Sequence, residues 1–187
     1  MRAFIALPIP LNIRMALAAL QQDLAQARAD VKWVAPEHLH VTLKFLDEIT
    51  EAQGRAVTEW LTRLAREQAP FTFGLNQLGA FPSLGDPRVL WVGLGEGKDT
   101  VRRWAEAIER EARAGGLTPE ERPFAAHVTL GRARSSKGRS SLVARLTQAA
   151  WSPPTAWLID AVTLYRSVLT SAGPQYTALA HVPLIGA

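Results

Sequence analysis

The sequence predicts an α+β protein of two lobes related by a pseudo-twofold axis, with antiparallel or mixed sheets lining a central groove and helices outside. Several strand-like segments follow one another with no helix between them, which favours antiparallel pairing over a doubly wound parallel sheet. The tripeptide His-x-Thr occurs once in each half, at His40–Thr42 and His127–Thr129, nearly half of the 187 residues apart. Because no linker of disordered composition separates the halves, we expect residues 1–187 to form a single bilobal domain.

Apolar periodicity gives the expected elements. Spacings of three and four residues predict helices around residues 13–24, 57–64, 101–112 and 142–149, the second behind a Thr50-x-x-Gln53 capping box and the third ended by Gly115-Gly116. Residues 31–45 look extended, apart from a turn at 35–37. The expected strands are residues 3–7, 71–75, 89–94, 128–133, 161–168 and 176–182. Gly- and Pro-rich residues 79–88 and polar, basic residues 135–141 are expected to be loops.

Composition excludes several classes of function. The chain has no cysteine, which excludes thiol nucleophiles, thiolate zinc sites and disulfides. A net charge of +4 is compatible with a polyanionic ligand but decides little. The apolar start is interrupted by Pro8 and Pro10, which indicates a strand and not a secretion signal. With no apolar run long enough to cross a membrane and no unusually apolar helix face, we expect a cytoplasmic monomer that does not bind membranes.

The His-x-Thr segments carry the expected chemistry. Side chains two positions apart on a strand point to the same side, so His40 shares a face with Thr42, and His127 with Thr129. The same alternation puts Lys44 in line with His40, and Val41 in the core. If the halves pack about a pseudo-twofold axis, the two His–Thr pairs meet across a cleft.

Two histidines facing one phosphate suit the cleavage of a phosphodiester. One neutral imidazole accepts a proton from water while one imidazolium donates a proton to the leaving oxygen, each step being worth roughly 10²–10⁴-fold in rate. The threonine hydroxyls donate hydrogen bonds to the phosphoryl oxygens. The arrangement requires neither a metal ion nor a cofactor. One His-x-Thr alone indicates little, but two copies in equivalent settings use two of only four histidines.

The segments His40-Val41-Thr42-Leu43-Lys44-Phe45-Leu46 and Phe124-x-x-His127-Val128-Thr129-Leu130-x-Arg132 resemble the two signatures of the 2H phosphoesterase superfamily. The similarity is greatest to its RNA 2′,3′-cyclic phosphodiesterase branch, also called the 2′-5′ RNA ligase family. It extends over nearly the whole chain, including the opening strand. The chain departs from the family's usual residues at Asp47 and Ala126, which carry no chemistry.

This resemblance implies hydrolysis of RNA 2′,3′-cyclic phosphate ends, or of small cyclic nucleotides, to 2′-phosphates. His40 is then the proton donor to the 3′ oxygen and His127 the base acting on water, while Thr42 and Thr129 hold the phosphate. The resemblance adds Arg132 as a charged clamp on the phosphate. Strict alternation places Arg132 on the face opposite His127, so this role needs a bulge at Gly131 or a side chain that reaches around the strand end.

Other residues have weaker signals. His38 lacks a threonine two positions later and is expected at the rim of the site. Lys44 attracts phosphate or is a solvated lysine at a strand end. Two further groups are candidates for RNA contacts: Arg134, Lys137 and Arg139 for the backbone, and Phe81 or Trp91 for a base.

Three other functions stay open at this stage. The first is a related enzyme: a 2′-5′ phosphodiesterase, a cyclic phosphodiesterase for nucleotide sugars, or an RNA-joining activity. The second is a non-catalytic protein that binds RNA ends. The third is a metal site of His38, His40 and His127, which is disfavoured because no carboxylate or further histidine lies at ligand spacing near His127.

Overall fold

The computed structural model describes residues 1–171 and 173–186. Helices and strands alternate irregularly along this part of the chain, as expected of an α+β protein. In order they are β1 (Arg2–Pro8), α1 (Leu11–Ala25), β2 (Val31–Trp33), the 3-10 helix η1 (Pro36–His38), β3 (His40–Glu48), α2 (Glu51–Arg66), β4 (Phe71–Phe73), β5 (Leu75–Ser83), β6 (Asp86–Leu94), α3 (Lys98–Ala114), β7 (His127–Ala133), α4 (Arg139–Gln148), β8 (Trp157–Ile159), β9 (Ala161–Thr170) and β10 (Gly173–Pro183).

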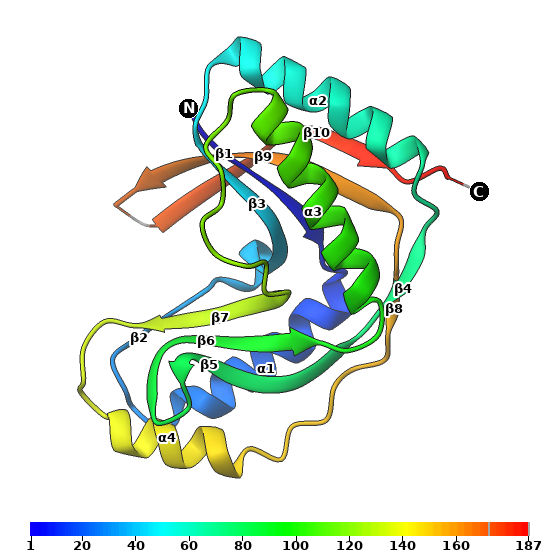
Figure 1. Ribbon diagram of the computed structural model, residues 1–187. Helices are drawn as coiled ribbons and strands as arrows, with labels where there is room; N and C mark the ends of the chain where they lie inside the picture. The colour runs from blue at the N-terminus through cyan, green and yellow to red at the C-terminus, as the bar shows by residue number, and fades with distance from the viewer. Residues whose placement is uncertain (172, 187) are drawn as a thin grey trace.

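One bent sheet runs through both lobes (Figure 1). Its strands follow the order β10-β9-β1-β3-β7-β6-β5, with β2 paired to β7 at the side, and β4 and β8 form a separate two-stranded sheet. Every described pair of neighbouring strands is antiparallel. The sheet confirms the expected fold class, and it joins the lobes only where β3 meets β7.

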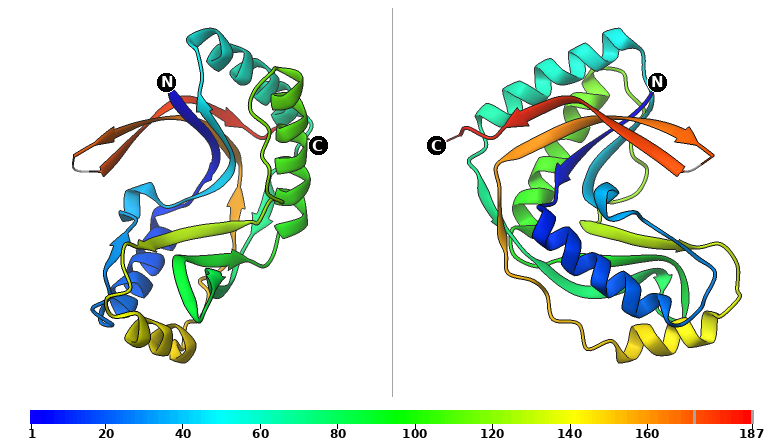
Figure 2. Two further views of the ribbon diagram at one scale, coloured as in Figure 1. Left: turned by 60° about the vertical axis from the view of Figure 1, so that its left-hand side comes forward. Right: turned by 180° about the vertical axis from the view of Figure 1, so that it is seen from behind.

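The helices cover the outer side of each lobe. Helices α2 and α3 pack behind β3, β9 and β10, whereas α1 and α4 lie behind the strands of the other lobe. Seen from two further directions, the ribbon bends into a C whose arms are these two lobes (Figure 2). The four α-helices of the described residues thus lie on the outside of the C, and a groove lined by both lobes opens between its arms (Figure 2).

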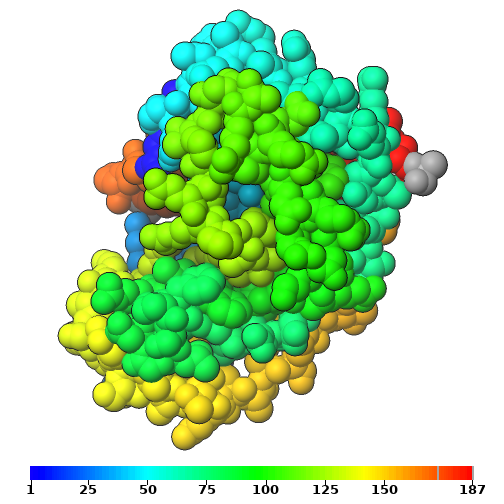
Figure 3. Space-filling model, viewed as in Figure 1, coloured from blue at the N-terminus to red at the C-terminus, as the bar shows by residue number. Residues whose placement is uncertain are grey.

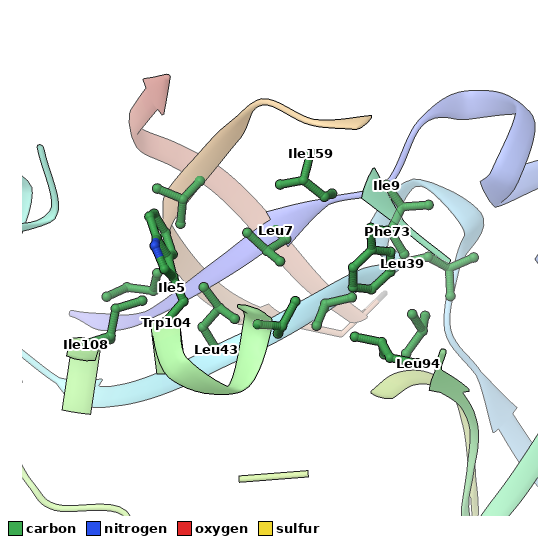
Figure 4. Packing of buried hydrophobic residues seen from close by; sticks show 14 of the residues in the cluster. Ile5, Leu7, Ile9, Leu39, Leu43, Phe73, Leu94, Trp104, Ile108 and Ile159 are labelled. Carbon is green, nitrogen blue, oxygen red and sulfur yellow. The ribbon is translucent and has the colours of Figure 1, made fainter. Parts of the chain in front are cut away.

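The core lies between the sheet and these helices. In the lobe that contains β3, Trp104 and Ile108 from α3 pack against Ile5 of β1 and Leu43 of β3 (Figure 4). Burying a side chain of this size contributes roughly 1.5–3 kcal/mol relative to leaving it exposed. The same layer thus fixes α3 firmly against the strand that begins with His40.

The structure corrects the two expected loops. Residues 79–88 belong mostly to β5 and β6, which are joined by a short turn at residues 84–85. Gly79 lies there because the ring of Trp91 covers it at a distance that leaves no room for a Cβ atom, and Pro82 is tolerated because β5 is an edge strand. The second expected loop, 135–141, ends early because α4 already begins at Arg139.

No helix within residues 1–171 and 173–186 is both long enough and apolar enough to span a membrane.

Candidate active site

The two His-x-Thr segments meet at the seam between the lobes. Strands β3 and β7 share one paired position, Val41 with Val128, and they run antiparallel. One step to either side of this pair, the antiparallel direction puts His40 beside Thr129 and Thr42 beside His127. All four of these side chains line the same groove, whose volume is about 700 Å³. The structure thus brings together the pairs that the sequence placed far apart.

Each catalytic candidate is held in the same way by a carbonyl two residues before it, just ahead of its strand. The Nδ1 atom of His40 lies 2.6 Å from the carbonyl oxygen of His38, and Nδ1 of His127 lies 2.6 Å from that of Ala125. Because a carbonyl oxygen only accepts, Nδ1 carries the proton in both rings, which leaves Nε2 as the acceptor in the neutral form. Both rings therefore present the same nitrogen to a ligand in the groove.

A β-bulge follows the threonine in both strands. In β3, Thr42 pairs with Ala6 but Lys44 pairs with Ile5, so Leu43 is the extra residue. In β7, Thr129 pairs with Trp91 but Gly131 pairs with Leu90, so Leu130 is the extra residue. Each bulge shifts the alternation by one position.

These bulges decide which residues after the threonines reach the groove. Arg132 lines the groove wall because the bulge turns it to the side of Thr129, as the expectation of a bulge near Gly131 required. Phe45, at the corresponding position of β3, also lines the groove and is 52% exposed. Lys44 was expected in line with His40, and this was wrong. Its side chain turns to the opposite face of β3 and is buried.

Aromatic side chains surround each imidazole. The ring of His40 lies 4.8 Å from that of Phe4 and 5.6 Å from that of Tyr176, and the ring of His127 lies 5.3 Å from that of Phe81. Burial lowers the pKa of His40 to about 4, although the hydrogen bond to the carbonyl of His38 opposes the shift. Burial also lowers the pKa of His127, as does the positive charge of Arg132. Both rings are thus neutral near pH 7 without a ligand.

Several groove residues had no signal in the sequence. Arg2 and Lys32 add positive charge to the lining, and Lys32 pairs across the strands with Arg132. Tyr176 comes from β10, and burial raises the pKa of its phenol, which stays protonated. Each of these residues is distant in sequence from the His-x-Thr segment that it lies beside, so its place in the groove follows from the strand order alone.

Other sequence candidates have different surroundings. His38 lines the groove and its ring lies 4.6 Å from that of Tyr176, which is compatible with a rim residue. Arg134 and Arg139 form ion pairs with Asp30 and Asp86, which reduces their charge available to RNA. The two aromatic candidates for a base contact, Phe81 and Trp91, pack beside His127 and are absent from the groove lining.

Comparison with known proteins agrees with this duplicated site. A family model described as LigT-like phosphoesterase matches the chain twice, at residues 7–91 and 92–176. An RNA 2′,3′-cyclic phosphodiesterase of Aeropyrum pernix is 34% identical over 89% of this chain and 93% of its own length. A protein of the same name from Methanothermobacter thermautotrophicus is 32% identical over 94% of this chain and 95% of its own length.

Solved structures agree in fold over the whole length. A crystal structure of a protein from Thermus thermophilus superimposes with a TM-score of 0.82 at 30% identity, covering 100% of this chain and 99% of that one. The crystal structure of E. coli LigT complexed with 3′-AMP gives a TM-score of 0.78 at 26% identity, covering 98% and 97%. The groove between two His-x-Thr strands is therefore built on a fold shared along the entire chain.

Proposed function

Because the chain belongs to the family of LigT-like phosphoesterases, we propose that it hydrolyses the 2′,3′-cyclic phosphate at the end of an RNA strand to a 2′-phosphate. The observation that carries this proposal is the meeting of two His-x-Thr pairs at one seam, both with Nε2 as the nitrogen left for the ligand. The curated relatives described above carry the name of this activity.

In the proposed reaction, His127 accepts a proton from water as the water oxygen attacks phosphorus. His40 donates its proton to the 3′ oxygen as the bond between phosphorus and that oxygen breaks. The hydroxyls of Thr42 and Thr129 donate hydrogen bonds to the non-bridging oxygens, and Arg132 adds a charge-assisted bond. Exchange with solvent returns the two imidazoles to their starting protonation. No step requires a metal ion or a cofactor.

The electrostatics of the groove favour His127 as the base and leave His40 to be prepared as the acid by the substrate. Arg132 lies on the strand of His127 and lowers the pKa of that histidine, which favours the neutral form that a base needs. His40 must be protonated to act as the acid, yet burial lowers its pKa to about 4. An anionic phosphate bound beside it favours the imidazolium and raises this pKa. Substrate binding therefore supplies the charge that prepares His40.

The role of His40 as donor to the 3′ oxygen also predicts how the substrate is oriented. The ribose that carries the 3′ oxygen lies on the side of His40, where Phe45 and Tyr176 offer aromatic surface to its base. Because both His–Thr pairs and Arg132 are supplied by the same chain, the proposed reaction needs no second copy, and we propose that the protein works as a monomer. Because the proposed substrate is RNA, we propose that the protein acts in the cytoplasm.

The test is hydrolysis of an oligonucleotide with a 2′,3′-cyclic phosphate by purified protein in EDTA. We expect a 2′-phosphate product, and a loss of at least about 10²-fold in rate for His40→Ala and for His127→Ala. A 3′-phosphate product would overturn the assignment of His40 as donor to the 3′ oxygen. Tight binding without turnover would instead indicate a protein that binds RNA ends, and faster cleavage of a 2′-5′-linked dinucleotide would indicate the related phosphodiesterase.

A further inference from the structure

Lys44 is a buried charge behind the sheet, on the face away from the groove. Its side chain is 2% exposed, and its Nζ atom lies 2.6 Å from a carboxylate oxygen of Glu109 on α3. The same Nζ donates a second hydrogen bond, 3.0 Å long, to the carbonyl oxygen of Thr118. A lysine in this setting is costly unless it is paired, and here both partners lie outside its own strand.

Glu109 extends this contact to the segment that leads to His127. Its other carboxylate oxygen accepts hydrogen bonds from Nε of Arg113, at 2.6 Å, and from the backbone N–H of Glu120, at 3.1 Å. Partial burial raises the pKa of Glu109, but the bonds from Lys44 and Arg113 outweigh it and the pKa lies below its usual value. An ionised carboxylate therefore links β3, α3 and residues 118–120.

The linked segment leads directly into β7, which begins with His127. Residues 115–126 connect α3 to β7, and Phe124 and Ala126 in this segment pack against the core. The carbonyl oxygen of Ala125, next in line, holds Nδ1 of His127. In the space-filling view the yellow-green segment between α3 and β7 lies over the front of the molecule, between the lobes (Figure 3).

The backbone supplies little else to hold the two histidines together. Strands β3 and β7 share only the pair Val41–Val128 among the described residues, whereas β7 pairs with its other neighbour from Val89–Arg132 to Gly93–His127. Two His–Thr pairs that act on one phosphate must nevertheless keep a fixed separation. Behind the sheet, the contact through Lys44 adds a link between β3 and the segment that leads into β7.

We propose that Lys44 is a positioning residue, which ties the strand of His40 to the segment before His127 and thereby sets the separation of the two imidazoles. This inference rests on the proposed function, since it assigns a role within the two-histidine reaction. Lys44 does not touch the substrate, because the bulge at Leu43 turns it away from the groove.

The main test uses Lys44→Met, which keeps an unbranched apolar side chain, one atom shorter, and removes the charge. We expect kcat per folded molecule to fall by about 10- to 100-fold, while KM changes by less than about threefold, because misplacement by about 1 Å costs up to about 10²-fold in rate. We expect Lys44→Arg to recover part of kcat. The matched control is Arg63→Met, which removes the exposed ion pair of Arg63 with Glu111 between α2 and α3 and should leave kcat unchanged.

A second readout does not depend on turnover. Long-range ¹H–¹⁵N spectra of the imidazoles report the proton on Nδ1 of each ring. In Lys44→Met we expect the Nδ1–H signal of His127 to shift or broaden while that of His40 is retained, because only His127 follows the released segment. Glu109→Gln keeps the shape of the side chain but removes the ionic partner of Lys44, and it should move the same signal in the same direction if Lys44→Met does not fold.

The outcomes separate this inference from the proposed function. Unchanged kcat and an unchanged His127 signal in folded Lys44→Met would overturn the positioning role. So would a loss of activity that follows the unfolded fraction alone. If His40→Ala and His127→Ala kept full activity, the proposed function would fail, whereas the ring signal of His127 would still report whether Lys44 holds it.

Discussion

The two halves of the groove have the same backbone arrangement but carry different side chains. In each half a strand begins His-x-Thr-Leu, its histidine bonds to the carbonyl two residues earlier, and the leucine forms a bulge. After the bulge the halves diverge. The strand of His40 continues with Lys44 and Phe45, and that of His127 with Gly131 and Arg132. A duplicated frame thus holds two unlike sets of side chains.

The residue after each bulge that faces away from the groove differs between the halves. Lys44 reaches back to Glu109 on α3, whereas Gly131 has no side chain because a Cβ there would lie 2.8 Å from a methyl group of Val31. Helix α1 instead holds the second bulge through Gln21, whose amide donates to the carbonyl oxygen of Leu130 at 2.8 Å. Each half is therefore held on the face away from the groove by a polar side chain of a helix, through an ion pair to α3 in one half and an amide hydrogen bond from α1 in the other.

The residue that faces the groove after each bulge also differs between the halves, and the proposed binding mode uses this difference. Arg132 offers a charge to phosphate, and Phe45 offers a flat apolar surface. A symmetric pair of arginines would suit a ligand with two anionic groups. The observed pair suits a ligand with an anion on one side and a base on the other, as the end of an RNA strand has. This difference between the halves is compatible with the proposed RNA substrate.

The largest effect that we expect concerns the burial of His40. Its pKa is lowered from 6.5 to about 4 in the folded protein. Above pH 6.5 the ring is neutral in both the folded and the unfolded state, so no stability is lost. As the pH falls from 6.5 to 4 the unfolded state gains a proton that the folded state does not, and the free energy of unfolding drops by about 3 kcal/mol.

This prediction is checked by urea unfolding of the wild type and of His40→Asn between pH 7 and pH 4. Other acidic groups titrate in this range in both proteins, so the difference between the two curves isolates His40. We expect the advantage of the wild type over the variant to shrink by about 3 kcal/mol. Parallel curves would show that the ring is not held neutral by burial.

The next largest effect concerns Arg132. A hydrogen bond to a charged group is worth about 1.5–3 kcal/mol, so Arg132→Ala should lower kcat/KM by about 10- to 150-fold. Arg132→Lys should recover only part of this, because a lysine does not offer the paired donors of a guanidinium. Arg102→Ala on the exposed surface of α3 is the control for a lost positive charge. An equal loss in Arg102→Ala would reduce the role of Arg132 to general attraction.

The sequence predicts the start of each motif strand better than its continuation. Alternation correctly places His40 with Thr42 and His127 with Thr129, because no irregularity intervenes between them. Beyond the threonines it fails at Lys44, since a bulge depends on pairing with a neighbouring strand and leaves little trace in one strand alone. Only Gly131 gave a local hint of such a bulge.

The surroundings of the histidines were less accessible to prediction. Phe4 from the first strand of the chain and Tyr176 from the last meet beside His40, with ring centroids 4.9 Å apart. Their proximity follows from the strand order, which periodicity does not give. The loop expected at residues 79–88 failed for a related reason. Gly79 signals close contact with the ring of Trp91 on the paired strand and not a turn.

The smallest effect that we expect, and the sharpest test of the comparison, concerns Phe45. Stacking of a base on an aromatic side chain is worth roughly 1–3 kcal/mol, and the low end applies where one face of the ring is used, so Phe45→Ala should raise KM about tenfold with little change in kcat. Stability should change little, since Phe45 is 52% exposed.

A cyclic phosphate without a base, such as glycerol 1,2-cyclic phosphate, is the matched substrate control. Its KM should be the same for the wild type and Phe45→Ala, whereas Arg132→Ala should impair both substrates. If Phe45→Ala impaired the base-free substrate as strongly, Phe45 would act on the phosphate or on the shape of the groove, and the division of the substrate between the halves would be wrong.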